Sequence, residues 1–416
     1  MIDILILADD LSGAADCASS CLRSGRKPIV LLDRWADPGD AAVVAVDINS
    51  RAKSPQEAGA AMAAQVERLL SHHTRILYQK MDSTLRGNWA QETACVLKAM
   101  ATIYGRRPLA IVAPSFPAAG RTVVGGRSLL KGVTLEATEI WARERLMRPA
   151  APAAWLAAEG LRVAQASLDD VRRGPDRLSF VFARGNADQT DAIVCDAQTD
   201  DDLAAIARAA LTLMPMPLCV GSAGLMRALA GGEGGATAEQ VCDTTALRPV
   251  MVAVGSASQV SQGQVQTLVA ERAMRAVMIT PAALRAGRTS GPVRLVSNQI
   301  SEALASGSDL IVVIDGSEGV DLREGPQLAA ALADLVGPQL ACIGGLIATG
   351  GETARAILTR SGVSGLRVRG EVEPGIPLSS ALGLSGLSVV TKAGAFGDPT
   401  TLIRCVDAIR GRSVGF

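Results

Sequence analysis

The stretch RILYQKMDSTLRGNWA, residues 75–90, decides how this chain folds, because an apolar run there meets a crowd of polar side chains. Residues 75–79 have the apolar, β-prone character of a buried strand, and residues 88–100 have the periodicity of a helix. Between them, KMDSTLRG at residues 80–87 holds two cations, one carboxylate and two adjacent hydroxyls. Ser83 or Thr84 alone would suffice to cap the helix, so the excess predicts a binding site at the end of a strand.

Strands and helices alternate on both sides of this stretch. We expect strands at residues 3–8, 28–32, 41–46, 109–113, 192–195, 217–220, 249–254, 310–314, 346–348 and 388–390. We expect helices at residues 12–24, with Ser12 as the N-cap, and at 55–71, 201–213, 223–229 and 353–361. Residues 115–132 break the pattern and predict a long loop or hairpin. Strands that alternate with helices pair in parallel through right-handed crossovers, so the predicted fold class is α/β.

A glycine-rich segment marks a domain boundary. GGEGGATAEQ, residues 231–240, has the composition of a linker. We therefore predict a first domain at residues 1–230, a linker at 231–247 and a second domain at 248–416. Each domain is expected to hold a mostly parallel sheet flanked by helices.

The composition argues against several classes of function. The formal net charge is +0 and no block of like charges occurs, so neither nucleic acid nor a membrane is expected as a partner. The eight cysteines include no C-x-x-C pair, and the only histidines, His72 and His73, are adjacent, which disfavours a zinc site or a Ser-His-Asp triad. The start, MIDILILADD, lacks the flanks of a signal peptide, and no apolar run is long enough to span a bilayer, so we expect a cytoplasmic protein.

The ends of the first strands supply further candidate site residues. Asp9 and Asp10 directly follow the first strand, and Arg51 lies in the loop after the strand that leads to Asp47. Ligands of open parallel sheets bind at the carboxyl ends of the strands. One acid there could simply favour a helix N-terminus, but two adjacent acids indicate a role in binding a hydroxyl, taking a proton or holding Mg²⁺ through water. A guanidinium beside them could clamp a carboxylate.

The second half of the chain has three glycine-rich turns after expected strands. They are VGSAS at residues 254–258, ATGGETA at 348–354 and KAGAFGD at 392–398. Glycine allows close backbone approach, and N–H groups at a helix start bind phosphate. The chain has neither a Walker A loop nor G-x-G-x-x-G, so the sequence predicts a nucleotide site of another type.

Taken in order, these motifs resemble the four-carbon acid sugar kinase family. The matching stretches, between residues 7 and 398, are ADDLSGAAD, NSR, KMDSTLRGNWAQE, APSFPAAGRTVVGG, CDAQTDDDL, GSAGL, VGSASQVSQGQV, ATGGETA and KAGAFGD. Members of the family use ATP to phosphorylate the terminal hydroxyl of D-threonate, D-erythronate or 3-oxo-tetronate. The resemblance implies that the N-terminal domain binds the sugar acid and the C-terminal domain the nucleotide, with the reaction between them. Ser12 departs from the threonine of many relatives but keeps the hydroxyl.

The resemblance also implies roles for individual residues. The candidate bases, which the sequence does not rank, are Asp9, Asp10 and Asp82. The expected substrate-binding residues are Asp9, Arg51, Lys80, Asp82, Ser83, Thr84 and Arg86. The expected nucleotide-binding residues are Ser256, Ser258, Thr349, Gly350, Gly351, Glu352, Thr353 and Gly394. Either Arg51 or Lys80 would hold the substrate carboxylate. ATP and Mg²⁺ are the expected cofactors; the Mg²⁺ ligands stay undefined, with Asp398 and Glu352 as indirect contributors.

Other functions are weighed against this one. A ribokinase-like sugar kinase would share the AGAFGD turn, at residues 393–398, but not the strand-end chemistry of the first half. A phosphatase with an aspartyl nucleophile would have Asp-x-Asp after its first strand. A non-catalytic sugar-acid-binding protein would need no nucleotide turns. We expect D-threonate as the substrate, with D-erythronate and 3-oxo-tetronate as alternatives, and the oligomeric state stays open, a homodimer included.

Overall fold

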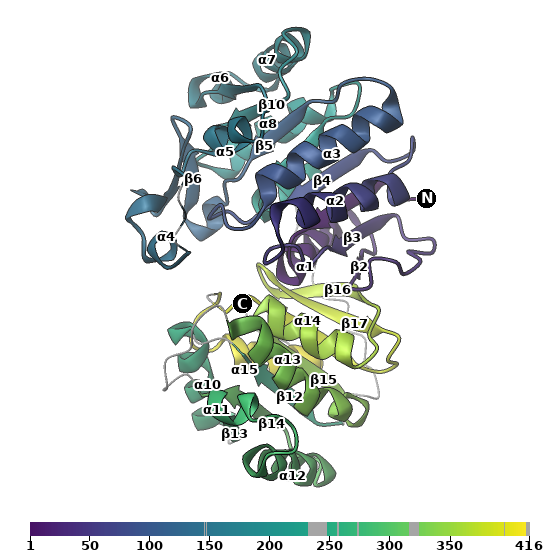
Figure 1. Ribbon diagram of the computed structural model, residues 1–416, viewed down its shortest axis with the longest axis vertical. Helices are drawn as coiled ribbons and strands as arrows, with labels where there is room; N and C mark the ends of the chain where they lie inside the picture. Colours follow the sequence, from purple (N-terminus) through teal and green to yellow (C-terminus); the bar gives the residue numbers. More distant parts are fainter. Residues whose placement is uncertain are drawn as a thin grey trace. The chain divides into compact units, whose positions relative to one another are not determined.

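The chain divides into two compact units, shown as a ribbon in Figure 1. The computed structural model describes residues 1–144, 146, 148–231, 248–255, 258–272, 274–315, 324–394 and 396–412. The first unit comprises Met1–Pro28 and Asp37–Gly234, and the second comprises Ile29–Ala36 and Gly235–Phe416. The predicted first domain includes residues 29–36, which this division assigns to the second unit. Apart from Gly231, the predicted linker lies outside the described residues.

The first unit is built on a parallel sheet, as the alternating pattern predicts. Its strands, in spatial order, are β3 (Val43–Asp47), β1 (Ile4–Ala8), β4 (Ile76–Lys80), β11 (Leu218–Gly221), β5 (Ala110–Ala113), β10 (Ala192–Cys195) and β9 (Val163–Ala166). Every neighbouring pair in this order is parallel. All five residues of β1, ILILA, are buried, as expected for a strand covered on both faces.

Helices surround this sheet. They are α1 (Leu11–Ser20), α2 (Pro55–Leu69), α3 (Trp89–Tyr104), α4 (Glu139–Glu144), α5 (Pro152–Ala158), α6 (Leu168–Arg172), α7 (Pro175–Ala187), α8 (Asp200–Leu211) and α9 (Ala223–Ala230), with 3-10 turns η1 (Cys21–Ser24), η2 (Pro117–Ala119) and η3 (Leu135–Ala137). Helix α2 packs against α3, and α3 contacts α5, whereas α1 packs against α9, and α9 contacts α8. Ser54 and Glu57 form a capping box at the start of α2, with Pro55 in its first turn.

A small antiparallel sheet occupies the region where the sequence predicts a long loop or hairpin. Its strands are β6 (Arg121–Val124), β7 (Arg127–Leu130) and β8 (Val133–Thr134). The turn between β6 and β7 is held by Asp196, directly after β10, which accepts hydrogen bonds from Gly125 N at 2.7 Å and Gly126 N at 2.9 Å. The excursion is therefore fixed to the carboxyl edge of the main sheet.

The second unit has a mixed sheet. In spatial order its strands are β13 (Arg275–Ile279), β14 (Leu310–Ile314), β12 (Val250–Val254), β15 (Gly345–Thr349), β18 (Ser388–Lys392), β17 (Ile376–Leu382), β16 (Gly365–Glu373) and β2 (Ile29–Leu31). The pairs from β13 to β18 are parallel, and those from β18 to β2 are antiparallel. The sequence prediction missed the β16–β17 hairpin and placed β2 in the first domain, because local periodicity does not say which sheet a strand joins.

The helices of the second unit enclose an apolar core. They are α10 (Gln259–Arg272), α11 (Pro281–Arg285), α12 (Gly291–Ala305), α13 (Gly325–Val336), α14 (Gly351–Arg360) and α15 (Thr401–Ile409), with the 3-10 turn η6 (Gly337–Cys342). Strand residues such as Val252 and Ile347 meet Leu402 and Val406 of α15 in this core. The predicted α/β class is confirmed for both units. Among the described residues, no helix has the length and apolar character needed to cross a membrane.

Candidate functional site

The predicted site residues of the first unit meet at the carboxyl edge of its sheet. Ala8, the last residue of β1, lies in register with Asp47 on one side and Lys80 on the other. The main-chain pairing continues past the strands, because Ser50 N donates to Asp9 O at 3.0 Å. The segments that follow three adjacent strands are thereby brought side by side, as the strand-end rule predicts.

Arg51 binds both aspartates that follow β1. Its Nε donates to Asp9 Oδ2 at 2.7 Å and its Nη2 to Asp9 Oδ1 at 3.0 Å. Its Nη1 also donates to Asp10 Oδ2 at 3.1 Å. The Asp9 side chain is 2% exposed and that of Asp10 19% exposed. Most of the donors of Arg51 are therefore engaged by carboxylates of the protein itself.

Asp10, rather than Ser12, caps the first helix. Asp10 Oδ1 accepts a hydrogen bond from Gly13 N at 2.9 Å, because α1 begins at Leu11 and Ser12 already lies in its first turn. The predicted N-cap was therefore wrong. A Cβ on Gly13 would lie 2.8 Å from Asp10 Oδ1 and 3.0 Å from Lys80 Nζ. Glycine at this position lets the Lys80 ammonium approach the start of the helix.

The two adjacent aspartates differ in their proton affinity. Burial raises the pKa of Asp9 and outweighs the attraction of Arg51, and the neighbouring charge of Asp10 raises it further. Burial also acts upward on the pKa of Asp10, but Arg51 and Lys80 together hold that pKa below its usual value. Asp9 is therefore the member of the pair that takes a proton more readily.

The KMDSTLRG segment is organised around Asp82. Arg86 binds Asp82 with two hydrogen bonds, Nε to Oδ2 at 2.9 Å and Nη2 to Oδ1 at 2.9 Å. Thr84 donates to the same carboxylate from its main-chain N at 3.1 Å and from its hydroxyl. Although burial acts upward, the Arg86 guanidinium holds the pKa of Asp82 well below its usual range. Asp82 is thus a firmly ionised anchor of its own loop.

This segment does not cap the next helix. Helix α3 begins at Trp89 with Asn88 as its N-cap residue, so Ser83 and Thr84 lie more than a turn before it. Leu85 has φ 63°, a left-handed conformation that is uncommon for leucine and that concentrates at functional sites. The polar groups therefore have another purpose than capping.

Three site residues were missed by the sequence prediction. Arg121, the first residue of β6, donates from Nη1 to Ser83 Oγ at 3.0 Å. Ser50 donates from its hydroxyl to Glu92 Oε1 at 2.5 Å, and Glu92 is fully buried. Burial raises the pKa of Glu92 to about 8, with the Asp9 charge as the next contribution. Arg121 lay in the quoted GR pair and Glu92 on the buried face of α3, but spacing alone did not indicate contacts with the strand ends.

The predicted nucleotide turns follow the parallel strands of the second unit. Gly350, with φ 93°, is the N-cap residue of α14, Gly351 is its first residue and Glu352 lies in its first turn. A Cβ on Gly255, directly after β12, would lie 2.0 Å from Thr353 Oγ1. Two of the glycine-rich turns are thereby adjacent at one sheet edge, with Thr349, the last residue of β15, buried between strands β12 and β18.

The third turn is tied to the same edge. Ser258 Oγ donates to Gly394 O at 2.7 Å, and Ser261 Oγ donates to that carbonyl at 2.9 Å. Lys392, fully buried, donates from Nζ to Ala393 O at 3.1 Å and to Phe396 O at 3.0 Å. Burial lowers the pKa of Lys392 to about 8. Ser256, also predicted to bind nucleotide, lies outside the described residues.

Asp398, a possible contributor to Mg²⁺ binding, is engaged by other residues of the second unit. Asp398 accepts hydrogen bonds from Thr400 and pairs with Arg404 at 2.8 Å, which keeps its pKa below the usual value. In the part of the chain that the structure describes, no three His, Cys, Asp or Glu side chains gather in a way that could hold a metal ion. A Mg²⁺ ion that enters with a nucleotide would need only one or two protein carboxylates beside phosphate oxygens and water.

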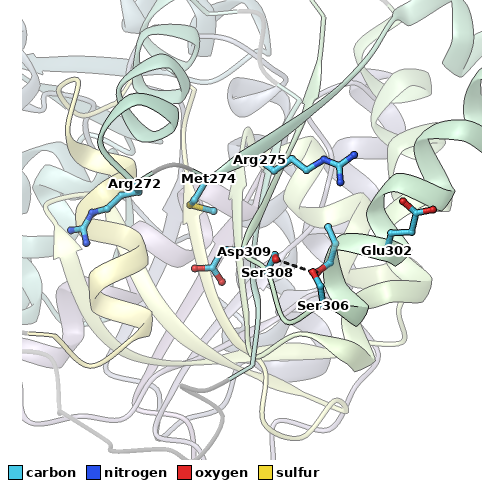
Figure 2. Close-up of a pocket in the computed structure, with 8 residues that line it drawn as sticks. Arg272, Met274, Arg275, Glu302, Ser306, Ser308 and Asp309 are labelled. Carbon is cyan, nitrogen blue, oxygen red and sulfur yellow. Dashed lines mark hydrogen bonds between the residues drawn. The ribbon is translucent and has the colours of Figure 1, made fainter.

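A pocket elsewhere in the second unit lies away from these turns. Its volume is about 400 Å³, and Figure 2 shows residues that line it, including Arg275, Glu302 and Asp309. Arg275 is the first residue of β13, and Asp309 directly precedes β14. The pocket is therefore at the amino ends of these strands, opposite the edge at which the glycine-rich turns lie.

Comparison with known proteins agrees with the geometry. Residues 4–229 match a family model described as a sugar-binding N-terminal domain, and residues 251–402 match one described as a nucleotide-binding C-terminal domain. The chain is 45% identical over 407 residues to a D-threonate kinase of Cupriavidus necator, covering 96% of each chain. It is 30% identical over 421 residues to a D-threonate kinase of Salmonella typhimurium, again covering 96% of each.

More distant relatives and solved structures extend the match. A D-erythronate kinase of Heliobacterium modesticaldum is 25% identical over 449 residues, covering 98% of this chain and 97% of the relative. The crystal structure of a Salmonella typhimurium protein has the same fold, with a TM-score of 0.78 at 20% identity, covering 97% of this chain and 99% of that one. Sequence motifs, fold and full-length similarity agree, and the chain belongs to the four-carbon acid sugar kinase family.

Proposed function

We propose that this protein transfers the γ-phosphate of ATP to the terminal (4-) hydroxyl of D-threonate. The similarity to two D-threonate kinases over nearly the full chain supports this substrate, and the D-erythronate and 3-oxo-tetronate kinases are more distant, at 25–26% identity. The observation that carries the proposal is the cluster of Asp9, Asp10, Arg51, Lys80 and Asp82 at one sheet edge. This cluster supplies acceptors for sugar hydroxyls and cations for a carboxylate.

Asp9 is the proposed base. Phosphoryl transfer to an alcohol needs a group that accepts the hydroxyl proton as the bond to phosphorus forms. Among the three candidates, Asp9 alone has a raised pKa, whereas Asp10 and Asp82 are held in the ionised form by neighbouring cations. A carboxylate of higher pKa is the stronger base. Asp82 then orders the loop that carries Ser83 and Thr84.

Lys80 is a better candidate than Arg51 for contact with the substrate carboxylate. Arg51 is occupied by Asp9 and Asp10, while the Lys80 ammonium has three donors and gives one to Met81 O at 2.9 Å. Lys80 is 7% exposed, so its charge acts where water screens it weakly. Arg86 is likewise occupied, by Asp82.

The second unit is the proposed ATP-binding domain. The main-chain N–H groups at the start of α14, Gly351 to Thr353, are suited to phosphate oxygens. The turns that hold Ser258 and Gly394 lie beside these N–H groups. Lys392 stabilises the turn after β18 by donating hydrogen bonds to the carbonyls of Ala393 and Phe396. Mg²⁺ arriving with the nucleotide would neutralise the phosphate charge.

A coupled assay of ADP release tests the proposal. The purified protein is incubated with ATP, Mg²⁺ and, one at a time, the threonates, the erythronates and 3-oxo-tetronate. We expect the highest kcat/KM with D-threonate and background ADP release without a sugar acid. A higher value with D-erythronate or 3-oxo-tetronate would replace the substrate and keep the reaction. If none of these acids stimulates ADP release, the proposal is contradicted.

A further inference from the structure

Arg121 reaches the sugar-acid site from an element that the strand-end motifs do not include. It is the first residue of β6, and its guanidinium donates to Ser83 Oγ at 3.0 Å in the KMDSTLRG loop. A serine hydroxyl that accepts this bond keeps its own proton for donation to another group. Arg121 and Ser83 therefore present a pair of donors at one side of the site.

The backbone that carries Arg121 is fixed on both sides. Arg121 and Phe116 exchange main-chain hydrogen bonds, at 3.0 Å from Arg121 N and 2.7 Å from Phe116 N. Val123 pairs with Ala197 in the same way, and Ser115 Oγ donates to Ala197 O at 2.8 Å. Asp196 also accepts hydrogen bonds from the β6–β7 turn. These bonds fix the backbone of Arg121 before a ligand binds, so binding need not order this segment.

The pKa values of the three arginines of the site shift in different directions. Although burial acts downward on the pKa of Arg51, Asp10 and Asp9 raise it, and Asp82 raises the pKa of Arg86. For Arg121 the direction is opposite: burial lowers its pKa, and the attraction of Asp82 and Asp16 is too weak to restore it against the like charge of Arg86. An additional anion beside Arg121 would stabilise its charged form.

We propose that Arg121, with the Ser83 hydroxyl and the Lys80 ammonium, binds the substrate carboxylate and so selects a sugar acid over an uncharged sugar alcohol. The proposal rests on the proposed function, because it names the part of the same substrate that this arginine recognises. A planar guanidinium offers a carboxylate two parallel donors, which a neutral hydroxymethyl group cannot match.

The test compares Arg121→Gln and Arg121→Lys with the wild-type protein. Arg127→Gln is the matched control, because Arg127 is on the same small sheet and pairs with Glu136 at 2.6 Å with 47% of its side chain exposed. Two quantities are measured: the Kd of the sugar acid by calorimetry without ATP, and kcat/KM for D-threonate and for D-threitol, which lacks the carboxylate.

We expect Arg121→Gln to raise the Kd and KM for D-threonate by about 10- to 100-fold, the worth of a charge-assisted hydrogen bond, and to leave kcat/KM for D-threitol within about threefold. Arg121→Lys should fall between Arg121→Gln and the wild type, and Arg127→Gln should match the wild type.

The contrary outcomes separate the two proposals. If Arg121→Gln keeps its fold by circular dichroism and the ratio of kcat/KM for D-threonate to that for D-threitol is unchanged, the role of Arg121 is overturned and the proposed function stands. A wild-type protein that binds the acid but does not phosphorylate it would overturn the proposed function and leave the calorimetric comparison to decide on Arg121. Neither binding nor turnover would overturn both.

Discussion

Arg51 holds Asp9 by two parallel hydrogen bonds, of 2.7 Å from Nε and 3.0 Å from Nη2, and at the same time contacts Asp10. One guanidinium thus compensates two carboxylates that follow the same buried strand. A buried carboxylate next to another one is costly unless a cation lies beside both. The relationship explains why the segment after β3 must come to the end of β1.

Replacing Arg51 by Lys should therefore disturb activity more than charge alone would suggest. A lysine ammonium cannot offer the same fork to two carboxylates, so we expect kcat/KM for the sugar acid to fall by about 100-fold or more. The control is Arg26→Lys, since Arg26 pairs with Asp3 at 3.0 Å just before β1, at the other end of that strand. Steady-state kinetics and ATP titration of both variants check this. Equal kinetics for the two variants would contradict it.

Asp9 and Asp82 should respond differently to conversion into asparagine. Asp9→Asn removes the proposed base, and we expect kcat to fall by about 10²- to 10⁴-fold with the Kd of ATP unchanged. Asp82→Asn releases Arg86 and Thr84, so we expect it chiefly to raise KM for the sugar acid. Single-turnover rates at saturating sugar acid separate the two effects. A larger loss of rate in Asp82→Asn would move the base to Asp82.

Glu92 should make stability depend on pH. Its pKa is about 8 in the folded protein against an ordinary 4.5, so the folded state holds a proton that the unfolded state releases between these values. The unfolding free energy should therefore fall as the pH rises from about 4.5 to about 8. Glu92→Gln removes this titration. The unfolding free energy of the variant should therefore rise relative to that of the wild type by a few kcal/mol between pH 5 and pH 8. Urea unfolding at several pH values measures it; a difference that does not change with pH would be the contrary result.

Lys392 should be needed for the nucleotide and not for the sugar acid. Its ammonium donates to the carbonyls of Ala393 and Phe396, so Lys392→Met leaves the 393–396 turn without these bonds. We expect the Kd of ATP to rise at least about tenfold and the Kd of D-threonate to stay the same. Lys98→Met, at an exposed position of α3, is the control. Weaker binding of the sugar acid instead would contradict the assignment of the second unit.

The contact between Gly255 and Thr353 tests how closely the glycine-rich turns pack. A Cβ on Gly255 would overlap Thr353 Oγ1, at 2.0 Å, so Gly255→Ala should destabilise the protein and weaken ATP binding. Thr353→Ala in the same chain should recover part of the stability, because it removes the overlapping atoms. Gly263→Ala, in α10 with nothing within 4 Å of the added Cβ, should not destabilise the protein. Thermal unfolding of the four proteins gives the comparison, and equal melting of Gly255→Ala and Gly263→Ala would refute it.

The sequence was informative where chemistry follows from chain position. The bounds of buried strands such as 310–314 were predicted to the residue. A short run of mostly β-branched residues between polar ones indicates a buried strand. The juxtaposition of Asp9, Arg51 and Lys80 followed from the rule that parallel strands end at one edge. Both inferences depend only on local pattern and on the α/β class.

Other features depend on contacts between distant segments, which no local pattern encodes. The N-cap of α1 is Asp10 and not the predicted Ser12, because the helix begins at Leu11 and not at residue 12. Strand β2 joined the sheet of the second unit by antiparallel pairing with β16, with Leu31 opposite Gly365. Arg121 reached Ser83 across 38 residues because the small sheet is fastened to β10. In each case the partner lies far along the chain or depends on the position of a helix end.

Phosphorus-31 NMR of the reaction of ATP with D-threonate tests the central claim most directly. With the wild-type protein and Mg²⁺, we predict that a phosphate monoester appears in step with ADP and couples to the terminal CH₂ protons, and that Asp9→Asn forms it at least about 100-fold more slowly. Formation of ADP and inorganic phosphate without an ester, or an ester on another hydroxyl, would contradict the claim.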